Sequence, residues 1–217
     1  MRPGGVAAPS VAGGGGEGAG DATDANLDEY QDAALAEVMG GANRFITGRA
    51  GVGKSFIVKR IVTELEDRQR KVAVTASTGA GAVIIGGCTV HSFAGIELGK
   101  GTKEELATKV LSNHYARKRW REYDVLLLDE ISMVDDDLLA KLNYVARRCR
   151  NQTEGGLHPE PFGGMQLILS GDFFQLPPVV RGGGHVFAFE GATWVELNLL
   201  TVELLKVSFK RNRVLGL

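Results

Sequence analysis

Cysteine is scarce in this chain, since only Cys88 and Cys149 occur among its 217 residues. Two cysteines do not make a disulfide framework, which predicts reduced thiols in an intracellular protein. The sequence also lacks an apolar run long enough to cross a bilayer. Its first residues carry neither the apolar block of a secretory signal nor a composition rich in Arg and Ser. We therefore expect no membrane partner, with the nucleus, the mitochondrion and the cytoplasm open as locations.

An excess of charge of either sign is missing as well. The 25 Lys and Arg residues nearly balance the 26 Asp and Glu residues, so the formal net charge is -1. A globally basic surface is thereby excluded, and any contact with nucleic acid must be a local patch. The hydrophobic fraction of 44% and the charged fraction of 24% are those of a soluble globular protein. The length suits one domain with or without a tail.

Glycine, in contrast, is abundant, and it marks the two ends of the first expected helix. Residues 1–25 form a Gly/Ala-rich tail that buries too little apolar surface to fold, so we expect it to be disordered. Order should begin at Asn26, which can cap a helix, with Glu29 as its capping-box partner. Gly40 and Gly41 should end that helix.

The segment Gly48-Arg49-Ala50-Gly51-Val52-Gly53-Lys54-Ser55 fits the phosphate-loop pattern at every fixed position. Glycines allow a tight turn whose N–H groups point at phosphate oxygens, and the following helix adds its positive end. Lys54 would reach the β- and γ-phosphates, and the Ser55 hydroxyl would ligate Mg²⁺. The sequence therefore predicts an ATP-binding loop, while a chance glycine turn carrying Lys-Ser is the weaker alternative.

Strands and helices alternate along the rest of the chain. The strands are short and apolar on both faces, which is typical of a parallel sheet covered by helices on both sides. We therefore predict an α/β fold of the P-loop NTPase type. The expected strands span 43–47, 71–76, 125–128, 165–169 and 201–205, and the expected helical segments span 54–67, 103–121 and 135–150.

Two carboxylates follow the strand at 125–128. Ligands bind beyond the carboxyl ends of parallel strands, so Asp129 and Glu130 should open on the same edge as the phosphate loop. Asp129 would complete the Mg²⁺ site, and Glu130 would act as general base on the attacking water. An ordinary solvated Asp-Glu pair is the alternative. An acid beside the metal ligand favours hydrolysis over phosphoryl transfer to a small acceptor.

A second specific string is Ser170-Gly171-Asp172-Phe173-Phe174-Gln175-Leu176-Pro177-Pro178-Val179, a loop leaving a buried strand. With this string, the chain closely resembles Pif-family DNA helicases, the RecD-like branch of superfamily 1. Four strings carry the likeness, which runs from about residue 26 to 205: residues 47–55, residues 124–135 (DVLLLDEISMVD), residues 162–179, which contain the string above, and residues 89–96 (TVHSFAGI).

The resemblance implies a RecA-like ATPase lobe that uses MgATP and single-stranded DNA or DNA junctions. Gln31 resembles the family's adenine-reading glutamine, with an exposed helix residue as the alternative. Gln175 resembles its γ-phosphate sensor. The family unwinds DNA with 5′→3′ polarity in repair, recombination and telomere maintenance, which implies a monomeric enzyme of the nucleus and/or mitochondrion. The residues that resemble its strand contacts are Ser77, Thr78, His91, Ser92 and Phe93.

Several of these positions keep an alternative. Phe93 suits core packing better than base stacking, and His91 suits a structural histidine as well as a DNA contact. The cations of residues 117–121 suit a solvated helix face with Trp120 tucked against the core. Near the C-terminus the family has an aromatic residue followed by Arg-Gln, whereas here Phe209 is followed by Lys210 and Arg211. Lysine cannot form the bidentate fork of arginine, so the sequence departs from the family pattern at this position.

The family's motor also needs a second RecA-like lobe, which has no counterpart among these residues. We expect residues 26–217 to form the first lobe alone, whether as a truncated gene model, a pseudogene or a real short product. Two other functions stay open: a catalytically idle fragment that binds DNA or a partner, and a small P-loop kinase. The kinase is less favoured, because no Arg-rich lid follows and Glu130 suits water activation.

Overall fold

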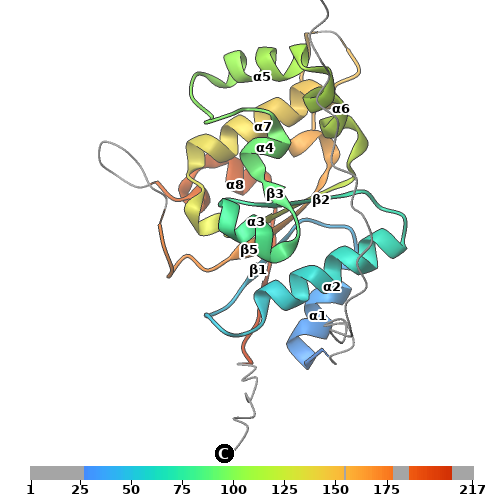
Figure 1. The fold of residues 1–217 in the computed structure, drawn as a ribbon, viewed down its shortest axis with the longest axis vertical. Coiled ribbons are helices and arrows are strands. Elements are labelled where there is room, and N and C mark those ends of the chain that lie inside the picture. The colour runs from blue at the N-terminus through green and yellow to red at the C-terminus, as the bar shows by residue number, and fades with distance from the viewer. Residues whose placement is uncertain (1–26, 154, 178–185, 207–217) are drawn as a thin grey trace, which may run out of the picture.

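The structure is a computed structural model, and it describes residues 27–153, 155–177 and 186–206 (Figure 1). The expected tail at 1–25, the cap at Asn26, residues 178–179 and the Lys210/Arg211 position lie outside these ranges. No helix in the described part is long and apolar enough to span a membrane. Cys88 and Cys149 are both free thiols.

The described strands form one sheet in which every pairing is parallel. The order across the sheet is β3-β2-β4-β5-β1-β6. Strand β5 therefore lies between β1, which precedes the phosphate loop, and β4, which ends at Asp129. The five predicted strands are all present, displaced by at most two residues at their ends. The bounds are β1 Arg44–Thr47, β2 Val72–Ala76, β3 Cys88–Thr89, β4 Val125–Asp129, β5 Gln166–Gly171 and β6 Leu200–Glu203.

Helices cover both faces of this sheet, as predicted (Figure 1). One face carries α1 (Glu29–Met39), α2 (Lys54–Asp67) and α3 (Gly79–Ile85). The other face carries α4 (Val90–Ala94), α5 (Lys103–Ser112), α6 (His114–Glu122), α7 (Asp136–Arg150) and α8 (Ala192–Glu196). Short 3-10 turns, η2 (Ile131–Met133), η3 (Pro161–Gly164) and η4 (Ala188–Glu190), join these layers.

The sheet has a hydrophobic core on each face, and successive side chains of β4 alternate between the two cores. Leu126 and Leu128 enter the core under α4 to α8, whereas Val125 and Leu127 enter the core under α1 to α3. All four are at most 1% exposed. Complete burial of a Leu or Val side chain stabilises a fold by roughly 1.5–3 kcal/mol, so this strand anchors both layers at once. An apolar strand followed by two carboxylates is therefore held rigidly at its polar end.

The start of α1 differs from the expectation. The capping residue is Asp28, whose carboxylate accepts hydrogen bonds from the N–H groups of Tyr30 and Gln31 at 3.0 Å. The Gln31 side chain returns a bond to the Asp28 N–H at 3.2 Å and completes the capping box. The Asn26–Glu29 pairing was wrong, because the helix begins at Glu29 and its third residue is Gln31.

Two stretches contain more structure than the sequence indicated. The helical insert at 103–121 consists of α5 and α6, which are separated at Asn113, the residue whose side chain caps α6. The Gly/Ala segment after β2 forms α3 and α4, with β3 between them. Thr78 and Thr89 cap these two helices, and each helix ends at a glycine in the left-handed region, Gly86 and Gly95.

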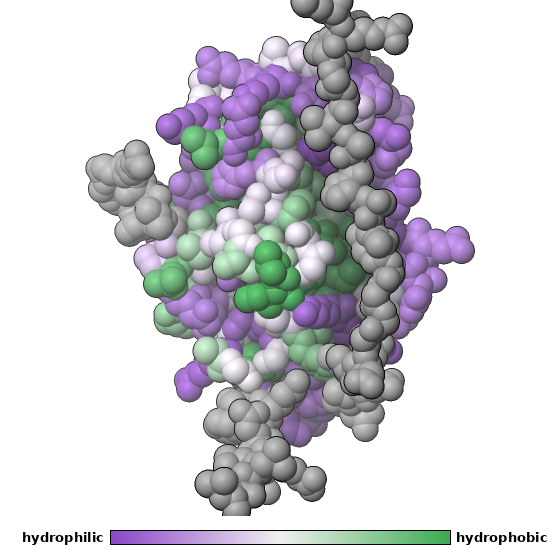
Figure 2. Space-filling view, in the orientation of Figure 1, coloured by the Kyte–Doolittle hydropathy of each residue, from purple (hydrophilic) through white to green (hydrophobic). Residues whose placement is uncertain are grey.

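The face shown in Figure 2 carries an apolar patch over α3. Val83 and Ile84 are its most exposed members on this helix, at 81% and 56%. The opposite side of α3 supplies Ala82 and Ile85 to the core. This helix therefore rests on the sheet with apolar side chains on both sides.

Candidate functional site

Four loops line up along the carboxyl edge of the sheet in the order of their strands. Residues 77–78 follow β2, residues 130–135 follow β4, residues 172–177 follow β5 and residues 48–53 follow β1. Because β2, β4, β5 and β1 are successive neighbours, segments far apart in sequence become adjacent in space. The topology therefore brings the predicted phosphate loop, acidic pair, glutamine and strand-contact residues to one edge.

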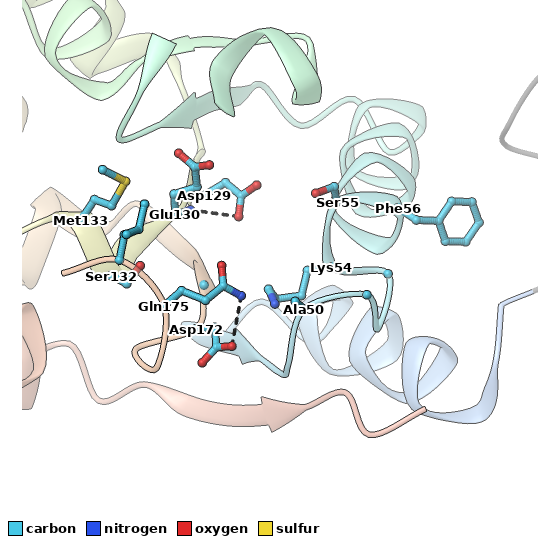
Figure 3. Close-up of a pocket in the computed structure, with 14 residues that line it drawn as sticks. Ala50, Lys54, Ser55, Phe56, Asp129, Glu130, Ser132, Met133, Asp172 and Gln175 are labelled. Carbon is cyan, nitrogen blue, oxygen red and sulfur yellow. Dashed lines mark hydrogen bonds between the residues drawn. The ribbon is translucent and has the colours of Figure 1, made fainter. Parts of the chain in front are cut away.

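Three of these loops enclose a cleft of about 420 Å³ (Figure 3). The close-up shows Lys54 pointing across the cleft toward Asp172 and Gln175, with Asp129 and Glu130 at the end of β4. The lining residues are Ala50, Gly51, Gly53, Lys54, Ser55, Phe56, Asp129, Glu130, Ser132, Met133, Gly171, Asp172, Gln175 and Leu176. All the residues predicted for catalysis and for Mg²⁺ therefore meet in one cleft.

The phosphate loop has the backbone that its glycines predict. Gly53 caps α2 with φ of 87° and ψ of 24°, a conformation that a side chain would strain. The Lys54 amine donates hydrogen bonds to the carbonyls of Gly48 and Arg49, the second at 3.1 Å. Burial lowers the pKa of Lys54, while Asp172 and Asp129 oppose that change. Lys54 is thus a half-buried cation that the loop carbonyls hold over the cleft.

Asp129 lies at the bottom of the cleft and is 7% exposed. Burial raises the pKa of its carboxyl, and the negative charge of Glu130 acts in the same direction. The Glu130 N–H donates a hydrogen bond to Oδ1 of Asp129 at 3.0 Å. The Ser170 hydroxyl also favours the charged form, although no hydrogen bond from this hydroxyl reaches ordinary geometry. The positive charge of Lys54 favours the charged form too, but the net direction of the pKa is upward. A buried carboxylate beside a second negative charge is a suitable ligand for a cation.

Glu130 occupies the left-handed region, with φ of 57° and ψ of 41°. Such a conformation costs about 1 kcal/mol in a residue other than glycine, and it recurs at functional sites. The turn directs the carboxylate away from the axis of β4 and toward the loop after β2. There its Oε2 accepts a hydrogen bond from the Thr78 hydroxyl at 2.6 Å.

Asp172 was not assigned a role from the sequence, and the structure gives it one. Its Oδ2 accepts a hydrogen bond from the Gln175 amide at 3.1 Å, and its Oδ1 accepts from the N–H of Phe174 at 3.0 Å. Asp172 therefore holds Gln175 at the cleft (Figure 3). Its position could have indicated this role, because Asp172 comes one residue after β5, as Glu130 comes one residue after β4.

Gln31, the residue predicted to read adenine, lies beneath the phosphate loop and is 3% exposed. Its amide donates to the carbonyl of Val52 at 3.3 Å. A Cβ at Gly53 would lie 2.6 Å from that amide nitrogen. The exposed-residue alternative is therefore wrong: Gln31 joins the start of α1 to the loop. Contact with a base stays a prediction.

The residues predicted to contact a DNA strand lie in three different environments. Ser77, Thr78 and half-buried His91 line a second, smaller pocket, and Ser92 is exposed. Burial lowers the pKa of His91, and Asp135 opposes that change. Phe93 is 4% exposed, with its ring centroid 5.0 Å from that of Trp120, so no free ring face is available to a base. The core-packing alternative describes Phe93.

In the basic segment at 117–121, Trp120 packs in the core as the favoured alternative predicted, whereas Arg119 is half-buried and does not lie on a solvated face. Trp120 is completely buried, and its indole N–H donates to the carbonyl of Ala94 at 3.2 Å. Arg119 donates to the carbonyls of Phe93 and Ser92 at 2.9 and 3.1 Å. These two side chains tie α6 to α4.

A phosphate loop, an acidic strand end and a glutamine, arranged along the edge of a parallel sheet, define the nucleotide-binding lobe of a P-loop NTPase. The chain belongs to the PIF1-like helicase family, whose model matches residues 26–212. It is 45% identical over 192 residues to the ATP-dependent DNA helicase PIF1 of Candida albicans, an alignment that covers 83% of this chain. The same alignment covers 20% of that relative, so the chain spans about a fifth of its length.

Solved structures agree with this assignment. The crystal structure of Pif1 helicase from Candida albicans matches with a TM-score of 0.78 and 46% identity, covering 85% of this chain and 41% of that one. Pif1 helicase from Bacteroides in complex with ADP-AlF3 and ssDNA matches with a TM-score of 0.70 and 31% identity, covering 85% and 43%. Pif1 helicases thus contain this α/β lobe as part of a longer chain.

Proposed function

We propose that this chain forms the MgATP-binding lobe of a DNA helicase that moves 5′→3′ along single-stranded DNA. The observation that carries the proposal is the convergence of Lys54, Asp129, Glu130 and Gln175 in one cleft. The 45% identity to an ATP-dependent DNA helicase supports the reaction class, and a Bacteroides relative in complex with ADP-AlF3 and ssDNA supports both ligands. The helicase would act on single strands and junctions in genome maintenance, as a monomer in the nucleus or mitochondrion.

The residues present suit a magnesium ion. Mg²⁺ commonly takes one or two protein ligands and fills its other positions with phosphate oxygens and water. The Ser55 hydroxyl and the buried Asp129 carboxylate line one cleft, and the described residues hold no cluster of three His, Cys, Asp or Glu that would form a complete protein cage. Ser55 and Asp129 would hold the ion, which would offset the negative charge of the phosphates.

Each remaining residue has a task in hydrolysis. Lys54 exchanges its two loop carbonyls for phosphate oxygens when nucleotide enters. Glu130, on the opposite wall, takes a proton from the attacking water. Gln175, oriented by Asp172, donates its amide to the γ-phosphate region without competing for the metal.

The test is the substitution Lys54→Ala, with Lys59→Ala as its matched control on the exposed side of the same helix. Binding of a fluorescent ATP analogue in the presence of Mg²⁺ is the measurement. We expect Lys54→Ala to weaken binding by roughly 10- to 100-fold, because it removes a charge-assisted contact worth about 1.5–3 kcal/mol. Lys59→Ala should bind as the wild type does. Equal affinity in the two variants contradicts the proposed nucleotide site.

A further inference from the structure

The Thr78 hydroxyl connects the nucleotide cleft to the adjacent pocket. It donates to Glu130 Oε2 at 2.6 Å and accepts from the Gly81 N–H at 3.0 Å. The Ser77 hydroxyl reaches the same carboxylate oxygen at the longer distance of 3.4 Å. The backbone fixes this contact, since β2 pairs with β4 up to Ala76 and Asp129, and the Ser77 N–H donates to the Asp129 carbonyl at 3.1 Å.

The two pockets share a wall made of these groups. The second pocket has a volume of about 310 Å³, and Ser77, Thr78 and His91 line it. Met133 lines both pockets, whereas Glu130 lines the nucleotide cleft. The hydrogen bond from Thr78 to Glu130 therefore crosses from one pocket to the other.

Acidic side chains in the second pocket are compensated. Asp135 accepts the Leu138 N–H at 2.8 Å, and Asp137 accepts the Lys141 amine at 2.6 Å. The Glu130 carboxylate, unlike that of Asp137, has no cation among its described hydrogen-bond partners, which are the hydroxyls of Ser77 and Thr78. Hydroxyl donors are also groups that bind the phosphates of a strand.

We propose that Thr78 is a positioning residue that holds the Glu130 carboxylate, and that a DNA phosphate competes with this carboxylate for the Thr78 hydroxyl. A hydroxyl has one proton, so it donates either to Glu130 or to a phosphate oxygen. Strand binding then releases Glu130 for its role in the nucleotide cleft. This inference rests on the proposed function, and it adds a physical route by which DNA controls hydrolysis.

Gly81 supports the same arrangement independently. A Cβ at this position would lie 2.5 Å from Glu130 Oε2, so the carboxylate fills the space that a side chain would take. Gly81 lies inside α3, where alanine is the better helix former. Gly81→Ala therefore displaces the carboxylate from Thr78 while leaving the hydroxyl and the helix in place.

A double-mutant cycle between positions 78 and 130 tests the competition. Binding of a fluorescent dT oligonucleotide is measured by anisotropy for the wild type, Glu130→Ala, Thr78→Val and the double variant. Removing the Glu130 charge strengthens DNA binding by electrostatics to the same degree in both backgrounds, and this part cancels in the cycle. We expect Glu130→Ala to strengthen DNA binding by a factor about five times larger in the wild-type background than in the Thr78→Val background. About fivefold is the effect of one hydrogen bond, the one that Thr78 can then donate to a DNA phosphate.

Further variants separate positioning from helix capping. Thr78→Ser keeps the hydroxyl and should restore the coupling, and Gly81→Ala should strengthen dT binding as Glu130→Ala does. Thr89→Val removes the equivalent cap of α4, where the Thr89 hydroxyl accepts from Ser92 N–H at 3.2 Å, and should leave the coupling unchanged. Equal effects of Glu130→Ala in both backgrounds overturn the inference.

Failure of the proposed function has a different signature. A wild-type chain that does not bind the ATP analogue with Mg²⁺ contradicts the nucleotide site itself. A wild-type chain that binds the analogue but no dT oligonucleotide overturns the competition alone.

Discussion

Asp129 shows how burial and chemistry oppose each other in a single residue. Burial raises the pKa of its carboxyl, so the folded chain favours the protonated form more than the unfolded chain does. A carboxyl of this kind lowers stability above its folded-state pKa, and stability rises as the pH falls from that pKa toward the ordinary value. The charge that the proposed magnesium site requires is therefore held at a cost to the stability of the fold.

The substitution Asp129→Asn separates the two effects. We expect it to raise the melting temperature by roughly 2–4 °C, the change that about 1 kcal/mol produces in a domain of this size. It should also abolish Mg²⁺-dependent binding of the ATP analogue. In the wild type, that binding should weaken on acidification at a higher pH than an ordinary aspartate would give. Calorimetry and a pH titration of binding are the measurements, and a melting temperature that falls would contradict this account.

At the level of elements, Arg150 joins three parts of the chain at the end of α7. It donates to the carbonyls of Trp120, Tyr123 and Gly163 at 2.7, 3.0 and 2.7 Å. The sequence placed this arginine at a helix C-terminus, where cations are expected, but the carbonyls that it serves belong to α6 and η3. The carbonyls of Trp120 and Tyr123 lie at the C-terminal end of α6, where helix carbonyls have no N–H donor within the helix.

Replacing this cation tests the connection. Arg150→Met should lower the free energy of unfolding by about 2 kcal/mol or more, because it leaves part-buried carbonyls without their charged donor. Arg148→Met, on the same helix, is the matched control, since no hydrogen bond of Arg148 is found in the described structure. Urea unfolding of both variants gives the comparison. Equal stability of Arg148→Met and Arg150→Met would mean that the contacts of Arg150 contribute nothing.

Elements with one dominant signal were predictable from the sequence. The helix at 54–67 was placed to the residue, because a glycine loop precedes it and its apolar residues recur at helical spacing. In contrast, α3 and α4 have 7 and 5 residues, too short for periodicity to show, and their threonine caps lie in a Gly/Ala-rich stretch. The site followed the same rule: motif residues were identified, whereas the contact of Thr78 with Glu130 depends on the pairing of β2 with β4.

At the scale of the whole molecule, the charges of the nucleotide cleft are unbalanced. Among the described residues that line it, Lys54 is the only cation, and it stands against Asp129, Glu130 and Asp172. A nucleoside triphosphate adds about four further negative charges, and close like charges repel strongly where water is partly excluded. If this cleft binds ATP as proposed, we expect binding to require Mg²⁺ and fast hydrolysis to require a cation from outside the described cleft.

This imbalance predicts how the 217-residue chain behaves by itself. Removal of Mg²⁺ with EDTA should weaken binding of the ATP analogue more than about tenfold. It should weaken binding of ADP by a smaller factor, because ADP carries one phosphate fewer. Hydrolysis should be roughly 10³-fold slower than in the longer Candida albicans relative, the smallest effect ascribed to an added arginine in phosphoryl transfer. Both rates are measured by phosphate release with saturating dT oligonucleotide. Equal rates would show that the described residues already supply every charge that the reaction needs.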